Sequence, residues 1–356
     1  MRSGVASVVL ASALVCACAP ISKLPALDKA EVAAEQRREQ IAQMRAYFAE
    51  MHRVETVAFR LRVANRHFCR TRVTALIGVF AATPESLPRR FRSFATEAMD
   101  LTWVRPTIIS LVDGSPAAKA GIRDHDEIIA LNGDLIPVTR TNRWIAAWLK
   151  RNGEKPVNVN LRRGGEDMTV SVTPTTGCSI PIEYVTSDEA NAFTDDERIV
   201  IYSGIVALTK NDAQLATVIG HELAHSSLGH LDKQAFNEIA AGGVGFAIDA
   251  AFQAGGAFTR AFAKAGRSAY SVEFEREADY VGAYYAARAG YDIAGTEEFW
   301  FAMGQTHPDS LRFATTHPTA PLRFVQMKKV AQEIAEKQRS GRPLVPDVKF
   351  ADAEAR

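Results

Sequence analysis

Residues 221–225 of the chain read His-Glu-Leu-Ala-His, a set of residue types that can bind and use a metal ion. Side chains four apart on a helix lie on one face, so His221 and His225 can direct ring nitrogens to a single ion. Glu222 lies one step round the same turn, where its carboxylate can reach a water molecule without binding the ion. The pattern therefore predicts one Zn²⁺ per chain, with Glu222 as the general base of a hydrolysis reaction.

A zinc site of this kind needs a third ligand, and the best candidate lies further along the chain. Glu275 and Asp279 are again one helical turn apart. One carboxylate can bind the ion, and the other can accept the free N–H of a ligating histidine and hold its ring. A solvated acidic helix face is the alternative, and we expect Glu277 to be part of such a face. His230 does not fit a three-histidine signature, so we expect it at a helix end or behind a ligand.

These motifs together resemble the HtpX and CAAX prenyl protease family of zinc metallopeptidases, which are of the gluzincin type. The resemblance covers roughly residues 178–335 and includes Glu-Arg-Glu-Ala-Asp at 275–279 and the pair His317-Pro318. It implies that His221, His225 and Glu275 are the zinc ligands and that the protein is a metalloendopeptidase.

The resemblance leaves three further roles open. Asn191, Ala192 and Phe193 match a family element that precedes the metal helix, and we expect them to bind substrate along an edge strand. His317 is a possible fourth ligand that blocks the site as a reversible latch. Arg323 either stabilises the oxyanion of the reaction or pairs with a carboxylate.

The elements that must position these residues predict an α+β protein, with a mainly helical peptidase domain at residues 178–340. Ahead of it, apolar residues from Asp28 to about Asn65 recur at three-and-four spacing, which predicts a long helix within a segment 19–69 that packs on the peptidase domain. The Ala/Gly-rich stretch 236–270 predicts a mobile lid or a surface pair of helices. Residues 341–356 lack periodicity and are expected to be disordered.

Residues 70–177 predict a separate β-rich module. Two runs of alternating apolar residues flank Gly164-Gly165 and form a hairpin. The segment from Gly114 to Gly133 resembles a bacterial PDZ domain, although the stretch 124–126 departs from the usual turn. Such domains hold a C-terminal peptide by adding it as a strand, and Ile77-Gly78-Val79-Phe80 is the candidate loop. A spacer with a closed groove is the alternative.

The first residues indicate an exported protein. Arg2 precedes an apolar stretch that is too short to span a bilayer, so residues 1–18 read as a signal peptide. Val15-Cys16-Ala17-Cys18 resembles a bacterial lipobox, with Cys18 as the lipidated residue. The resemblance points to a periplasmic protein on the outer membrane; an ordinary signal peptide cut near Ala19 is the alternative.

Two cysteines remain after such processing. In an exported protein, Cys69 and Cys178 are most simply explained as one disulfide, which would covalently link the two ends of the intervening module. Two buried thiols are the alternative.

The charge balance limits the partners. Lys and Arg number 42 against 41 Asp and Glu, so nothing favours nucleic acid. Family and compartment together predict unfolded or misassembled cell-envelope proteins as substrates. A chaperone or assembly factor with a latent zinc site and a partner-binding PDZ-like domain is the alternative.

Overall fold

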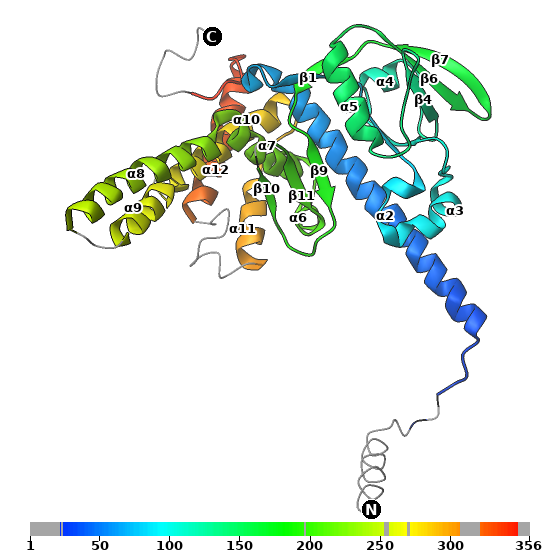
Figure 1. Cartoon of the computed structure of the whole chain (residues 1–356), viewed down its shortest axis with the longest axis horizontal. Helices are drawn as coiled ribbons and strands as arrows, with labels where there is room; N and C mark the ends of the chain where they lie inside the picture. Colours follow the sequence, from blue (N-terminus) through cyan, green and yellow to red (C-terminus); the bar gives the residue numbers. More distant parts are fainter. Residues whose placement is uncertain are drawn as a thin grey trace, which may run out of the picture. The chain divides into compact units, whose positions relative to one another are not determined.

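The computed structural model describes residues 22, 24–195, 197–252, 256–268, 271–306 and 321–347 (Figure 1). The expected lipidation site Cys18 and the expected latch His317 lie outside the described residues. By its internal contacts the chain divides into two units, Met1–Gln43 and Met44–Arg356. The second unit contains the inserted module and the residues of the metal motifs.

A long helix, α2 (Lys29–Ala64), forms where the apolar spacing predicted it. Its buried side chains in the second unit recur every three or four residues from Met44 to Leu61, so they share one face. Val54, Ala58 and Leu61 join the same apolar core as the helices that carry the metal motifs. This part of the helix therefore belongs to the same core as the metal motifs, although it precedes the inserted module in sequence.

The inserted module is a six-stranded sheet with its own apolar core. The strand order is β2-β3-β4-β6-β7, and β5 pairs with β4. Helices α4 (Pro116–Lys119) and α5 (Thr141–Asn152) accompany it, and α4 begins with Ser115 as its cap. The strands are β2 (Val79–Ala82), β3 (Thr107–Leu111), β4 (Glu127–Leu131), β5 (Asp134–Leu135), β6 (Val157–Arg163) and β7 (Glu166–Val172).

A narrow neck joins this module to the rest of the chain. Strand β1 (Val73–Leu76) pairs antiparallel with β8 (Thr175–Cys178), so the chain enters and leaves the module side by side. Cys69 and Cys178 form a disulfide at the base of the neck, with their Cα atoms 5.6 Å apart. The disulfide and the β1–β8 pair thus hold the two ends of the module next to each other.

The peptidase part combines a small sheet with helices. Its strands lie in the order β10-β11-β9, so β10 is an edge strand. Helices α7 and α10 pack against each other beside this sheet (Figure 1). With the inserted sheet, this confirms the α+β class. The elements are β9 (Ile182–Val185), β10 (Ala192–Thr194), β11 (Ile199–Tyr202), α6 (Ser203–Leu208), α7 (Asp212–Leu228), α10 (Ser271–Arg288), α11 (Glu297–Thr306) and α12 (Pro321–Arg339).

Two glycines allow α7 and α10 to come unusually close. A Cβ atom built on Gly220 would lie 2.6 Å from the carbonyl oxygen of Gly282, and one built on Gly282 would lie 2.6 Å from the backbone nitrogen of His221. Any larger residue would force the two backbones apart. The close approach therefore sets the distance between the motifs that the two helices carry.

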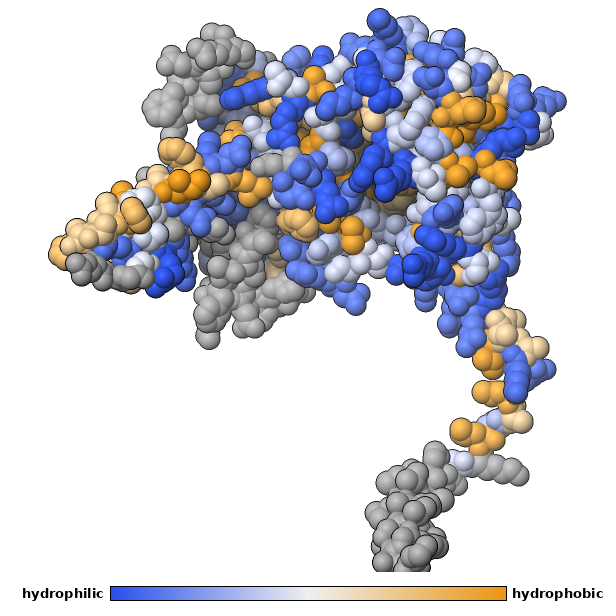
Figure 2. All heavy atoms as spheres, in the orientation of Figure 1, coloured by the Kyte–Doolittle hydropathy of each residue, from blue (hydrophilic) through white to orange (hydrophobic). Residues whose placement is uncertain are grey.

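The Ala/Gly-rich stretch forms a pair of helices, α8 (His230–Phe252) and α9 (Ala257–Ser268), which lie side by side (Figure 1). Asp249 accepts backbone hydrogen bonds from Phe258 and Thr259 and so caps the start of α9. Apolar side chains are exposed along α8 (Figure 2), among them Phe236, Ile239 and Phe246. No helix in the described part of the chain has the length and apolar character that crossing a bilayer requires.

The prediction that residues 341–356 are disordered is wrong for the first residues of this segment. Residues up to 347 pack against the peptidase core, where Lys337 donates hydrogen bonds to the Val345 carbonyl and to Asp347, both at 2.8 Å. Arg288 donates to the carbonyl of Leu344. Lys337 belongs to the helix just before this segment, but Arg288 lies 56 residues away on α10, and local composition does not reveal such a partner. Residues 348–356 lie outside the described residues.

Candidate metal centre

Helix α7 brings the two motif histidines onto one buried face. The Asn211 side chain caps its start by accepting a hydrogen bond from the Gln214 backbone, and Gly229 ends it with a φ of +66°. The Nε2 atoms of His221 and His225 lie 3.0 Å apart. Local sequence thus builds half of the site.

Helix α10 supplies the third candidate ligand from the opposite side. The Glu275 carboxylate lies 3.4 Å from Nε2 of His221 and 3.3 Å from Nε2 of His225. All three side chains are buried, and their ligand atoms lie within 4.8 Å of one another. The structure therefore brings together the three residues that the motifs singled out.

The donor set fits a zinc ion. A tetrahedral zinc with bonds of about 2.0–2.2 Å holds its ligand atoms roughly 3.3–3.6 Å apart. The two Nε2 atoms are 3.0 Å apart, Oε2 of Glu275 lies 3.4 Å from Nε2 of His221, and Oε1 lies 3.3 Å from Nε2 of His225. These separations, which involve both carboxylate oxygens, are close to this range. Two imidazole nitrogens and one carboxylate oxygen also leave a fourth position for water or substrate, as in catalytic zinc sites.

The protonation of the histidines follows from burial and from the carboxylates. Burial lowers the pKa of His225, which favours the neutral ring that a metal ligand needs. Burial also opposes a charge on His221, but its hydrogen bonds with Asp279 and Glu275 outweigh this and raise the pKa to about 10. Without metal the site therefore holds a proton, which a bound dication would replace.

Asp279 lies behind His221, as expected, and Arg323 lies behind Asp279. An Asp279 oxygen is 2.9 Å from Nδ1 of His221, which is the ring nitrogen that faces away from the ligand cluster. Arg323 donates two hydrogen bonds to the same carboxylate, at 2.6 and 2.8 Å. Burial alone would raise the pKa of Asp279, but the charge of Arg323 outweighs it and keeps the pKa below its ordinary value.

Of the two roles left open for Arg323, the geometry favours the carboxylate pair. Its side chain is buried, lies over the ring of Trp300 at 4.3 Å, and also reaches Glu275 at 3.3 Å. Arg323 therefore contacts two carboxylates of the site, Asp279 and Glu275, and its expected part in the reaction stays a prediction.

Glu222 borders a small hollow beside His221. Asn191, Ala192 and Trp300 also border it, and its volume of about 10 Å³ is at the lower limit of what can hold one water. Asn191 and Ala192, two of the three residues expected to bind substrate, therefore lie beside Glu222, and their role stays a prediction. Phe193, the third expected residue, does not line the hollow; its ring packs at 6.0 Å on Tyr202.

Sequence reasoning missed a second hydrogen-bonded chain behind the site. His230 is fully buried, and its Nδ1 lies 3.0 Å from Nδ1 of His225. Its Nε2 lies 3.1 Å from Glu277, which was expected to be only part of a solvated face. Phe274 stacks on the His230 ring at 4.7 Å. His230 was expected at a helix end or behind a ligand, and it is the first residue of α8 and lies beside His225; its contact with Glu277 was not expected.

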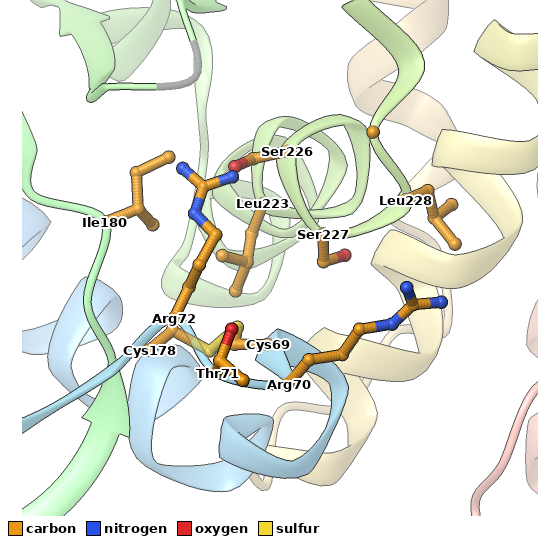
Figure 3. Close-up of a pocket in the computed structure, with 11 residues that line it drawn as sticks. Cys69, Arg70, Thr71, Arg72, Cys178, Ile180, Leu223, Ser226, Ser227 and Leu228 are labelled. Carbon is orange, nitrogen blue, oxygen red and sulfur yellow. A yellow bond between two sulfur atoms is a disulfide. The ribbon is translucent and has the colours of Figure 1, made fainter. Parts of the chain in front are cut away.

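A larger cavity of about 200 Å³ lies at the disulfide and borders Leu223, Ser226 and Ser227 of α7. Figure 3 shows the Arg72 side chain reaching from the disulfide towards Ser226. Leu223 and Ser227 are about half a turn round the helix from His221 and His225. The cavity therefore belongs to the neck and does not open on the metal face.

Comparison with known proteins agrees with this geometry. The model of peptidase family M48 matches residues 165–331, and that of the PDZ domain matches residues 77–173. The mitochondrial metalloendopeptidase OMA1 of Arabidopsis thaliana is 30% identical over 153 residues, which are 41% of this chain and 30% of that protein. The protein of the same name from Schizosaccharomyces pombe is 27% identical over 146 residues, 40% of this chain and 42% of that protein.

The chain thus spans less than half the length of these relatives. Among solved structures, the HtrA3 PDZ domain bound to a phage-derived ligand is 22% identical and covers 29% of this chain and 88% of its own, with a TM-score of 0.23. This chain thus resembles peptidase family M48 over residues 165–331 and the PDZ domain over residues 77–173.

Proposed function

We propose that this protein is a zinc metalloendopeptidase in which His221, His225 and Glu275 bind one Zn²⁺ and Glu222 is the general base. The observation that carries the proposal is the buried ligand triangle beside Glu222, because its separations suit tetrahedral zinc. The match to peptidase family M48 supports it.

Several residues of the chain have separate roles in the proposed peptide hydrolysis. When bound, zinc supplies Lewis acidity, which makes a water molecule more acidic and polarises the scissile carbonyl. Glu222 takes the proton from the attacking water and delivers it to the leaving amine. Asp279 holds the ring of His221 in a fixed orientation, and Arg323 holds Asp279.

The substrate we propose is an extended chain that adds to the free edge of β10. Backbone groups alternate sides along a strand, and the Asn191 carbonyl accepts from Tyr202 on the β11 side. The backbone of Ala192 therefore points to the open edge, next to the hollow that Glu222 borders. Recognition through backbone groups requires no particular side chains, so unfolded or misassembled proteins suit the site.

The proposal also includes the cellular compartment in which the protein acts. We place the protein in the cell envelope, exported by residues 1–18, lipid-anchored to the outer membrane through Cys18, and active on envelope proteins. A peptide C-terminus bound by the PDZ domain is the proposed second contact with a substrate or partner.

The test is cleavage of unfolded casein by the purified full chain, with zinc content measured on the same sample. Glu222→Gln should retain zinc and lose at least about a hundredfold in activity, because the general base is lost. Glu273→Gln is the matched control, since this exposed carboxylate lies on α10 near the ligand Glu275. Undiminished cleavage by Glu222→Gln would refute the mechanism, and a wild type that binds casein without cleaving it would favour an assembly factor.

A further inference from the structure

Strand β2 of the PDZ domain has one edge that the sheet does not use. Its other edge pairs with β3, where the Val112 backbone N–H donates to the carbonyl of Gly78. Because backbone groups alternate sides, those of Val79 and Ala81 point away from β3 and towards α5. A peptide that adds as a strand needs these groups.

At Ala81 both of these groups are already taken. The Ala81 N–H donates to Oδ1 of Asn142 at 2.9 Å, and Nδ2 of Asn142 donates to the Ala81 carbonyl at 2.9 Å. Two residues of an antiparallel pair exchange the same two bonds. The side-chain amide of Asn142 offers the same donor and acceptor as a peptide group, so it stands in for one residue of an added strand.

A second contact holds the same end of the groove. The Thr83 hydroxyl donates to the carbonyl of Val138 at 3.0 Å, which ties the end of β2 to the segment before α5. Thr83 and Ala81 are both fully buried. The space between β2 and the start of α5 is therefore filled at this point, and a peptide backbone cannot lie there without moving Asn142.

We infer that Asn142 closes the peptide groove of the PDZ domain and that an extended peptide with a free C-terminus binds only by displacing its side chain from Ala81. The N–H and carbonyl of Ala81 are hydrogen-bonded both before and after the peptide binds, because each lost bond to Asn142 is replaced by a bond to the peptide. The inference rests on the proposed peptide binding by this domain, and it does not depend on the peptidase reaction.

The test measures peptide binding by the full chain in EDTA, so that cleavage plays no part. The probe is a pool of fluorescein-labelled hexapeptides, random except for a C-terminal valine with a free carboxylate, and the readout is fluorescence anisotropy. Asn142→Ala should bind about tenfold more tightly than wild type, because the peptide no longer competes with two internal hydrogen bonds. Asn152→Ala should bind like wild type, since this side chain lies at the far end of α5, where it donates to the Trp148 carbonyl of its own helix. Equal affinity of Asn142→Ala and wild type, including no binding by either, overturns the inference.

A second variant and a second measurement separate release of the groove from loss of folding. Asn142→Asp keeps the acceptor for the Ala81 N–H but cannot donate to the Ala81 carbonyl, so its affinity should fall between wild type and Asn142→Ala. If Asn142→Ala unfolds at a lower temperature than wild type in a thermal scan, the peptide affinity of Asn142→Asp relative to wild type decides whether the inference holds. In a folded Asn142→Ala, the Ala81 amide should exchange hydrogen faster than in wild type and regain protection when peptide is added. Faster exchange without such recovery contradicts the inference.

Discussion

Asp279 connects the buried guanidinium of Arg323 with the metal-facing imidazole of His221. One of its oxygens lies 2.9 Å from the histidine Nδ1, and its carboxylate accepts two hydrogen bonds from the arginine. The carboxylate is itself fully buried. A histidine ligand held in this way keeps its orientation and the ring nitrogen that faces the metal.

Replacement of Asp279 by Asn should therefore weaken zinc binding without removing a ligand. The side-chain amide of asparagine is neutral, so it lacks the negative charge that pairs with Arg323. It also orients the His221 ring less strongly. We expect zinc affinity to fall about 10- to 100-fold. Competition with a chromophoric chelator measures this, with Glu273→Gln as control. Unchanged affinity in a folded Asp279→Asn would show that the carboxylate does not act on the ligand.

Gly282→Ala should damage the site through the backbone. Its new Cβ would lie 2.6 Å from the backbone nitrogen of His221, so α7 and α10 must move apart. The carboxylate of Glu275 then moves away from the histidines, and both zinc affinity and thermal stability should fall.

Gly243→Ala is the matched control for this change, since a Cβ at this helical glycine meets nothing within 4 Å. Alanine in a helix is favoured over glycine by up to about 1 kcal/mol, so this control should be neutral or slightly stabilising. A Gly282→Ala protein with wild-type melting temperature and zinc affinity would contradict the proposed role of the close approach.

Glu55 on α2 should make stability depend on pH. Burial raises its pKa to about 7, and the charge of Arg62 offsets part of that shift. The folded state thus binds the proton more tightly than the unfolded state, whose pKa is near 4.5. The stabilisation of the folded state by proton binding to Glu55 is complete below a pH of about 4.5, and it is lost as the pH rises through about 7.

Glu55→Gln should therefore match wild type near the lower pKa and be more stable at pH 8, by on the order of 1–3 kcal/mol. Chemical denaturation across this pH range measures the difference. Glu39→Gln, an exposed residue of the same helix, is the control. A wild type that gains stability relative to Glu55→Gln as the pH rises would reverse the predicted sign.

Loss of the disulfide should loosen the neck more than the PDZ core. Cys69 and Cys178 are 109 residues apart in sequence, and the bond between them closes the loop that holds the whole module. Changing both to Ser should cost about 2–5 kcal/mol of unfolding free energy. The module has an apolar core of its own, so its hydrogen-exchange protection should persist. Equal stability of the double variant and the oxidised wild type would contradict this prediction.

The PDZ module and the peptidase helices followed from short-range patterns. Alternation on both sides of Gly164-Gly165 predicts the hairpin of β6 and β7, because strand side chains alternate between faces. The stripe from Met44 to Leu61 predicts α2 for the corresponding helical reason. The packing of residues 341–347 did not follow, because two of their partners, Arg288 and Tyr280, lie more than 50 residues away on α10.

By itself the sequence determined which residues share a helix face: His221 with His225, and Glu275 with Asp279, because the four-residue spacing is a local property of the α-helix. Only the tertiary structure decided that these two faces meet, since that depends on the close contact of Gly220 with Gly282. It likewise decided that Arg323 pairs with Asp279 and that Asn142 holds Ala81. Contacts between distant segments depend on how whole elements pack, and no spacing along the chain encodes them.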